Sequence, residues 1–124
     1  MPNMIQIFGH PKCQGTRAAQ RFFSERKVKA EFVDVRERGL SRGELEVVAR
    51  AVGGASALWD GAGKRVTERG LQHIEPNVER LLALLLEDPL LLRTPVVRLG
   101  AKAIVGRDEA GWKALAVEAK AAAG

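Results

Sequence analysis

One cysteine, Cys13, occurs in the 124 residues of this chain, and it is the side chain best suited to covalent chemistry. It stands among Pro11, Lys12 and Gln14 rather than in an apolar run, whereas most free cysteines are small buried apolar residues. The thiolate, not the thiol, is the nucleophile, so reactivity depends on what stabilises the charged form. The position predicts a reactive thiol, with an inert buried cysteine as the alternative.

Three basic side chains near Cys13 would stabilise its thiolate. They are His10, Lys12 and Arg17, and positive charge close to a thiol lowers its pKa. The same cations suit the binding of an anionic substrate. We therefore expect these residues to form part of a substrate site around the cysteine.

Position 16 decides how an adduct on Cys13 would be resolved. A CxxC redox pair would need a second cysteine there, and the chain has Thr16 instead. Because thiol–disulfide exchange needs an attacking thiolate, an outside thiol must complete the reaction. Glutathione, glutaredoxin or thioredoxin would serve as this reductant, and no bound cofactor is expected. Thr16 itself either hydrogen-bonds the thiolate or only caps the following helix.

Two arginines flank a predicted β-hairpin in the last third of the chain. Arg93 precedes it and Arg107 follows it, so both guanidinium groups could converge on an oxyanion held at Cys13 by paired hydrogen bonds. The alternative for each is a solvated side chain or an ordinary ion pair. No metal site is expected, because the two histidines and the cysteine lack the spacing of zinc ligands.

The hydrophobic pattern of the first third predicts the elements that position Cys13. Residues 4–8 are apolar and β-branched and end at glycine and proline, as a buried strand would. Apolar positions recur at helical spacing over 15–27, and a second strand follows over 30–35. Cys13 thus lies at the start of a helix, where unpaired N–H groups and the helix dipole favour a thiolate.

The sequence pattern in the middle of the chain predicts helices. Ser41 and Glu44 have the spacing of a capping box, and the helix that they open ends at Gly53. Residues 55–70 lose this periodicity and predict a loop with one short helical turn.

A further helix and a hairpin complete the pattern. Pro76 fits an early position of a helix over residues 77–86. Strands over 93–98 and 103–105 are close enough to form a hairpin. An Ala-rich helix with acidic residues in its first turn follows over 108–122.

The resulting order of elements, β-α-β, then helices, then β-β-α, is that of a thioredoxin fold. We predict an α/β protein with a mixed four-stranded sheet, a single domain over residues 1–124, and a helical insertion over about 41–88. This fold carries a cis-proline beside its reactive cysteine, and Thr94-Pro95 stands at that place. Pro95 lacks an N–H, but Thr94 still offers both backbone groups to an incoming thiol-bearing chain. Without this context, a trans proline at the start of a strand is the alternative.

The composition excludes several classes of protein. Apolar residues make up 46% of the chain and charged residues 28%, which is too hydrophobic for a disordered protein. The net charge is +5, but Lys and Arg are spread along the chain, so we expect no direct nucleic-acid binding. The most apolar run, 81–86, is too short to span a bilayer. A lone cysteine and the lack of a leader predict a cytoplasmic protein without membrane attachment.

Several motifs together resemble the arsenate reductase and Spx family. In the first half these are IFGHPKC at 7–13, Arg17, and GLSRGEL at 39–45. In the second half they are LEDPLLLRTPV at 86–96 and VGR at 105–107. The motifs keep the order and spacing of the family's landmarks over nearly the whole chain.

The resemblance implies thiol chemistry. In the family's arsenate reductases the cysteine forms an adduct with arsenate, arginines hold the oxyanion, and glutathione with glutaredoxin completes the reduction. Cys13 and Arg107 match those positions. The arginine usually next to the cis-proline is Thr94 here, with Arg93 displaced by one residue, and another expected arginine is replaced around Asp60. We therefore expect weak or absent arsenate reduction.

Two other branches of the family bear on the function. Spx-type members are transcription regulators that bind the RNA polymerase α subunit and commonly carry a CxxC switch, which Thr16 rules out here. The small arsenate reductase-like branch commonly has one cysteine at this place, is implied to comprise glutathione-dependent thiol reductases, and resembles this chain most. The sequence thus predicts a thiol oxidoreductase acting on a small thiol or a thiol-bearing protein, with an Spx-like adaptor that binds polymerase as the alternative.

Overall fold

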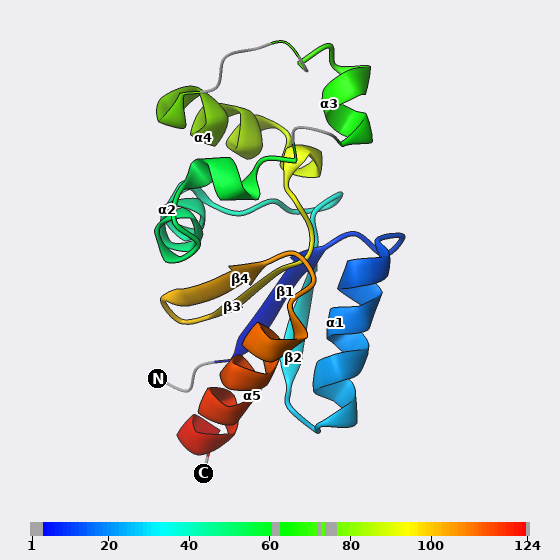
Figure 1. Ribbon diagram of the computed structural model, residues 1–124, viewed down its shortest axis with the longest axis vertical. Coiled ribbons are helices and arrows are strands. Elements are labelled where there is room, and N and C mark those ends of the chain that lie inside the picture. Colours follow the sequence, from blue (N-terminus) through cyan, green and yellow to red (C-terminus); the bar gives the residue numbers. More distant parts are fainter. Residues whose placement is uncertain (1–3, 61–62, 72, 74–76, 124) are drawn as a thin grey trace.

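A mixed four-stranded sheet forms the centre of the computed structural model, which describes residues 4–60, 63–71, 73 and 77–123 (Figure 1). The strand order is β2-β1-β3-β4, with β1 parallel to β2 and antiparallel to β3, and β3 antiparallel to β4. The strands are β1 (Ile5–Gly9), β2 (Ala30–Asp34), β3 (Val96–Leu99) and β4 (Lys102–Val105). This is the predicted sheet, and it confirms the α/β thioredoxin-like fold.

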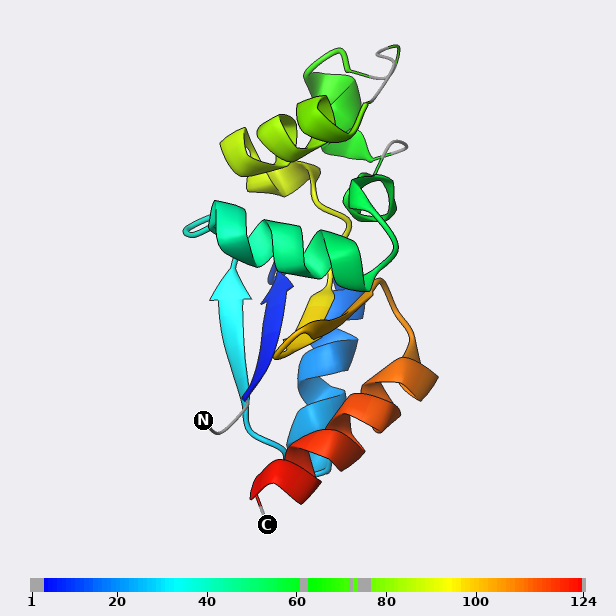
Figure 2. The same cartoon turned by 90° about the vertical axis from the view of Figure 1, so that its left-hand side faces the viewer.

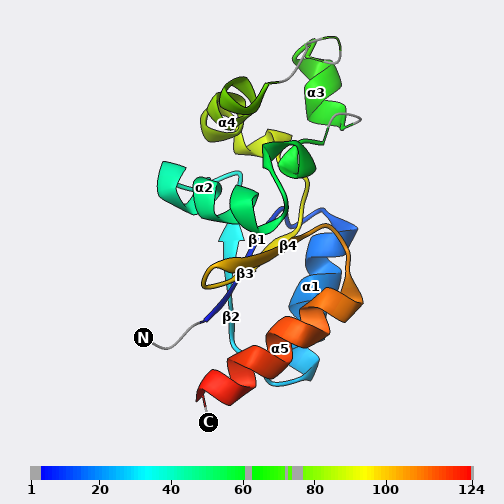
Figure 3. The same ribbon diagram turned by 60° about the vertical axis from the view of Figure 1, so that its left-hand side comes forward.

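Helices cover both faces of the sheet (Figures 2 and 3). Helices α1 (Gln14–Glu25) and α5 (Glu109–Ala123) pack on one face, and α2 (Arg42–Ala51) packs on the other. Successive side chains of a strand point to opposite faces, so Ile7 packs with α1 and α5 while Phe8 packs with the core under α2. Trp112 of α5 is fully buried, as its helical spacing indicates.

The segment between β2 and β3 is helical throughout most of its described length. After α2 come the 3₁₀ turn η1 (Ala55–Leu58), α3 (Lys64–Glu68), α4 (Val78–Glu87) and the 3₁₀ turn η2 (Pro89–Leu91). Two of these elements lie where the sequence predicted a loop with one helical turn, so the segment is more regular than its weak periodicity indicated. Figure 1 shows α3 and α4 stacked beyond α2, at the end of the sheet where β1 stops.

The structure confirms the predicted N-terminal cap of α2 and moves the start of α4 by one residue. The Ser41 hydroxyl accepts from the Glu44 N–H at 3.1 Å and the Glu44 carboxylate accepts from the Ser41 N–H at 2.8 Å, which is a complete capping box. Helix α4 begins one residue later than predicted, because Asn77 is its N-cap and accepts from the Arg80 N–H. The predicted role of Pro76 lies outside the described residues.

A buried carboxylate, Asp88, links α3 to η2, the segment that leads back to the sheet. It accepts from Arg65 Nε at 2.6 Å, from Arg69 Nη1 at 3.4 Å and from the Leu90 N–H at 3.2 Å. The last bond caps η2. Two arginines from α3 and its C-terminal end therefore converge on one acceptor, and this contact fixes where the α3 side chains lie.

None of the helices in the described part of the chain is long and apolar enough to cross a membrane.

Candidate active site around Cys13

Cys13 is the N-cap of α1, directly after the end of β1. Its backbone is extended, its N–H donates to the His10 carbonyl at 2.9 Å, and its own carbonyl accepts from the Arg17 N–H at 3.1 Å. The thiol is partly exposed. The open N–H groups of the first helical turn therefore lie next to the sulfur, as the sequence predicted.

The loop before β3 lies against this turn. The Thr94-Pro95 peptide bond is cis, as predicted, and the Cys13 thiol donates to the Thr94 carbonyl across 3.6 Å. A Cβ atom on Gly15 would lie only 2.9 Å from Pro95 Cδ. Glycine at this helical position thus permits the close approach that brings proline, cysteine and threonine together.

The surroundings of Cys13 lower its pKa. Partial burial raises the pKa, but this effect is outweighed by hydrogen bonds from the side chains of Thr16 and Thr94 and from the backbone of Thr16 and Gly15. The expected backbone N–H groups are among these causes. The leading contributions that lower the pKa are hydrogen bonds rather than the nearby cations, which the sequence also indicated.

Thr16 stands beneath the cysteine in the first turn of α1. It is fully buried, and its hydroxyl accepts from the His10 N–H at 3.4 Å. The N-cap of the helix is Cys13 rather than Thr16, so of the two interpretations of this threonine, the hydrogen bond to the sulfur is the one supported. Gly9 makes room for it, because a Cβ there would lie 2.4 Å from the Thr16 side chain.

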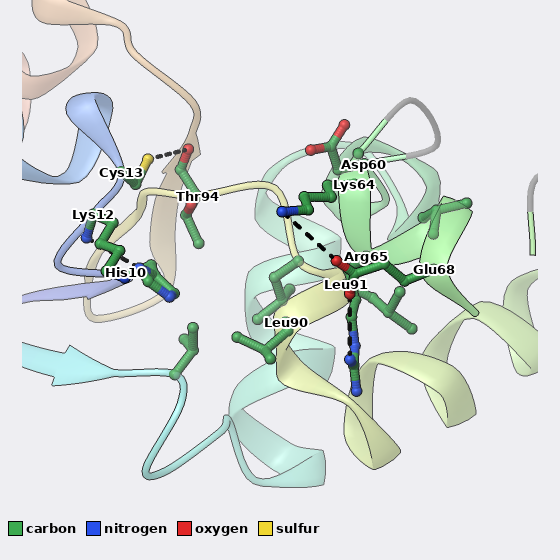
Figure 4. A pocket seen from close by; sticks show the side chains of 14 residues that line it. His10, Lys12, Cys13, Asp60, Lys64, Arg65, Glu68, Leu90, Leu91 and Thr94 are labelled. Carbon is green, nitrogen blue, oxygen red and sulfur yellow. Dashed lines mark hydrogen bonds and ion pairs between the residues drawn. The ribbon is translucent and has the colours of Figure 1, made fainter.

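A cavity of about 370 Å³ opens in front of the thiol (Figure 4). Its near wall consists of His10, Lys12, Cys13 and Thr94. The Lys12 N–H donates to His10 Nδ1 at 3.0 Å, which orients the imidazole beside the cysteine loop. Four of the predicted site residues are therefore brought together, and the volume falls in the range of small-molecule sites.

The far wall of the cavity comes from the helical segment and was not predicted as part of the site. It contains Asp60 and, from α3, Lys64, Arg65 and Glu68. The pair Lys64-Arg65 is visible in the sequence, but the weak periodicity placed it in a loop. Tertiary contacts, among them the ion pair between Arg65 and Asp88, hold α3 where its side chains line the cavity.

Three predicted arginines do not line the cavity. Arg17 is exposed on α1, Arg93 donates to the Trp59 carbonyl at 3.4 Å, and Arg107 pairs with an exposed glutamate at 3.8 Å. Arg107 still lies at the Cys13 end of the sheet, because the preceding Gly106 N–H donates to the Pro95 carbonyl at 2.8 Å. Their roles in binding an oxyanion stay predictions.

Among the described residues no group of three or more His, Cys, Asp or Glu side chains could hold a metal ion.

Comparison with known proteins places this geometry in a family. The ArsC family model matches residues 8–115. Arsenate reductases from two strains of Neisseria meningitidis are 32% identical over 105 residues, which cover 83% of this chain and 90% of theirs.

Solved structures agree in fold. An ArsC family related protein from Bacteroides fragilis superposes with a TM-score of 0.82 at 18% identity and covers 93% of this chain and 99% of its own. The arsenate reductase from Vibrio cholerae gives a TM-score of 0.77 at 20% identity and covers 92% of this chain and 98% of its own. Since the family model spans most of the chain and its Neisseria relatives exceed 30% identity along it, this protein belongs to the ArsC family.

Proposed function

We propose that this protein is a single-cysteine thiol oxidoreductase that uses glutathione or a redoxin as its external reductant. The observation that carries the proposal is the placement of a partly exposed thiol of lowered pKa at a helix N-terminus, in contact with Thr94 and at the wall of a cavity. Low pKa and access together are the properties of a reactive cysteine.

The reaction that fits one cysteine is a two-step exchange. The Cys13 thiolate attacks the glutathionyl sulfur of a mixed disulfide R–S–S–G, forms a Cys13–glutathione disulfide and releases R–S⁻, which takes up a proton. A glutathione thiolate then attacks the sulfur of that adduct, forms glutathione disulfide and returns the Cys13 thiolate. The sum is RSSG + GSH → RSH + GSSG, in which the entering glutathione sulfur is oxidised from thiol to disulfide and the R sulfur is reduced from disulfide to thiol.

Thr94 supplies the backbone contact for the incoming chain. Within the described residues its N–H has no hydrogen-bond partner, and its carbonyl accepts only from the Cys13 thiol. Once Cys13 loses its proton, the sulfur no longer donates, so both backbone groups of Thr94 become available. An extended thiol-bearing peptide would pair with them and direct its sulfur at Cys13.

Arsenate is the poorer substrate in this proposal. Its reduction to arsenite consumes two thiols and releases one disulfide and one water, and it needs cations around a multiply charged oxyanion. The cavity holds Lys12 and Lys64, but it also places the carboxylates of Asp60 and Glu68 near the cysteine, while Arg93 and Arg107 do not line it.

The test is glutathione-dependent reduction of a small mixed disulfide by wild-type protein and by Cys13→Ser. Activity in the wild type, a mass increase of one glutathionyl group on Cys13, and loss of both in the variant are expected. Absence of the adduct and of turnover would reject the proposal. Recovery of the RNA polymerase α subunit by both proteins, without exchange in either, would favour an Spx-like adaptor.

A further inference from the structure

The sheet ends in an open strand on the side away from β2. Among the described strands β4 pairs only with β3, so its other edge carries main-chain groups that have no strand partner. In Figure 3, β4 lies between α2 and α5. Such an edge is a template on which the strand of another chain can pair.

The register of the hairpin identifies the groups of β4 that face outward. The Gly106 N–H donates to the Pro95 carbonyl at 2.8 Å, and hydrogen-bonded pairs alternate with non-hydrogen-bonded pairs along an antiparallel ladder. Ile104, two residues before Gly106, therefore also bonds to β3. The N–H and C=O groups of Ala103 and Val105 point away from β3, toward the open edge.

A hollow of about 490 Å³ lies along this edge. Lys102, Ala103 and Ile104 of β4 line it, together with Ala51 at the end of α2 and Ala114 of α5. Because α2 and α5 cover opposite faces of the sheet, the hollow follows the edge rather than one face. The short side chains of the two alanines leave space beside β4 for a further strand.

The two edges of the sheet differ in their side chains. β2 carries the charged residues Glu31 and Asp34, and charges on an edge strand oppose pairing with another chain. β4 has a charge only at its first residue, Lys102, and continues with the apolar, partly exposed residues 103–105. Of the two edges, β4 is therefore the one suited to pairing.

The charges around β4 are compatible with a second copy of the same chain. The net charge of +5 opposes self-association in general. At this edge, however, each cation has an acidic partner, since Lys102 pairs with Glu118 and Arg107 pairs with Glu109. Two copies can therefore meet along β4 without net repulsion.

We propose that two copies of this chain pair through β4 in antiparallel orientation and form one continuous sheet, with four strands from each copy. The outward groups of Ala103 bond to those of Val105 in the second copy, and the two-fold axis passes at Ile104. The two Ile104 side chains then meet as an apolar cross-strand pair.

This register is also complementary in charge. It sets Lys102 of each copy opposite Gly106 of the other, next to the acidic residues 108–109 that precede and begin α5. The inference is independent of the proposed thiol chemistry, because Cys13 lies at the start of α1 and not at this edge.

Sedimentation equilibrium of the full chain tests the pairing, under reducing conditions that exclude a Cys13 disulfide between copies. The mass should rise with concentration from 13.5 kDa toward twice that value. Ala103→Pro removes an outward N–H and no bond to β3, so association should weaken at least about tenfold, because the two-fold axis repeats the lost hydrogen bond. Ala103→Ser keeps the N–H and should associate like the wild type.

Two outcomes of this experiment would overturn the inference. A single species of 13.5 kDa at up to about 1 mM would do so and would leave the edge to a strand of another protein. A dimer that Ala103→Pro retains at full strength would show that the copies meet through another face.

Amide hydrogen exchange of the wild type tests the register without any variant. The N–H groups of Ala103 and Val105 should exchange at least about tenfold more slowly in the dimer than in the dilute monomer, because each gains a hydrogen bond. The Ile104 N–H, which already bonds to β3, should change less. If the mass doubles while the exchange of Ala103 and Val105 stays constant, the proposed pairing is wrong.

Discussion

The Sγ atom of Cys13 lies 3.6 Å from the main-chain oxygen of Thr94, although 81 positions separate the two residues. The contact joins the first helical turn of the chain to the loop that returns from the helical segment. That loop is itself held by main-chain bonds, from the Arg93 N–H to the Leu58 carbonyl at 2.8 Å and from the Asp60 N–H to the Leu91 carbonyl at 3.4 Å. The environment of the thiol therefore depends on both halves of the protein.

Removal of the Thr16 hydroxyl should raise the pKa of Cys13. The hydroxyl is among the hydrogen-bond donors that lower this pKa, and valine keeps its shape without the donor. In Thr16→Val the pH at which iodoacetamide alkylation reaches half its maximal rate should move up toward that of a free cysteine peptide. Thr16→Ser, which keeps the hydroxyl, should stay near wild type. Superimposable profiles for wild type and Thr16→Val would contradict the role assigned to this hydroxyl.

The same shift links the thiol to stability. Because the pKa of Cys13 is lower in the folded chain than in the unfolded one, the thiolate stabilises the fold fully above the unfolded pKa. This contribution is lost as the pH falls through the folded pKa. The difference in urea stability between wild type and Cys13→Ser should therefore increase with pH across this window. A constant difference would show that folding leaves the thiol pKa unchanged.

Gly15 and Gly43 form a matched pair, since each is the second residue of a helix. Alanine at Gly15 would place its Cβ 2.9 Å from Pro95 Cδ, whereas alanine at Gly43 meets nothing within 4 Å. Gly43→Ala should stabilise the protein by up to about 1 kcal/mol. Gly15→Ala should destabilise it by about 1–2 kcal/mol and slow alkylation of Cys13. Urea unfolding and alkylation measure the two effects, and equal behaviour of the variants would show that the approach to Pro95 is not tight.

Asp88 should contribute more to stability than its neighbour Glu87. Asp88 is buried and caps η2 while accepting from Arg65 and Arg69, whereas Glu87 is exposed and, among the described residues, forms an ion pair with Arg69 alone. Asp88→Ala should lower the free energy of unfolding by about 1–2 kcal/mol, as loss of a cap does. Glu87→Ala should stay within about 0.5 kcal/mol of wild type. A similar loss in both variants would mean that Asp88 does not anchor α3.

Much of the fold could be predicted because its signals are local. Alternating and helical periodicities gave the strands and the long helices, and the spacing of Ser41 and Glu44 gave the start of α2. The approach of Thr94-Pro95 to Cys13 followed from the order of elements together with the family resemblance. These features depend on near neighbours in sequence or on a known topology.

The far wall of the cavity could not be predicted because tertiary contacts, not local sequence patterns, place its residues there. Helix α3 has five residues, of which only Val66 is buried, so it shows no amphipathic period. Its orientation depends on the ion pair between Arg65 and Asp88, which are 23 positions apart. One cause of the lowered Cys13 pKa was missed for the same reason, since the side chain of Thr94 reaches the sulfur only in the folded chain, whereas the hydrogen bonds from Thr16 and from the helical N–H groups could be predicted.

Asp60 offers a direct test of why the cavity should disfavour an oxyanion. Its carboxylate lines the same cavity as Cys13, at the place where the family resemblance leads one to expect an arginine. Asp60→Arg replaces a repulsive charge with a guanidinium that can bind an oxyanion through two hydrogen bonds. We expect glutathione-coupled arsenate turnover to rise from a low level by at least about tenfold, the effect of one charge-assisted hydrogen bond of about 1.5 kcal/mol or more. Glu37→Arg, the same change of charge at an exposed position outside the cavity, should leave turnover unchanged. Robust arsenate turnover by the wild type, abolished by Arg107→Ala, would instead show that the arginine outside the cavity supplies the oxyanion site.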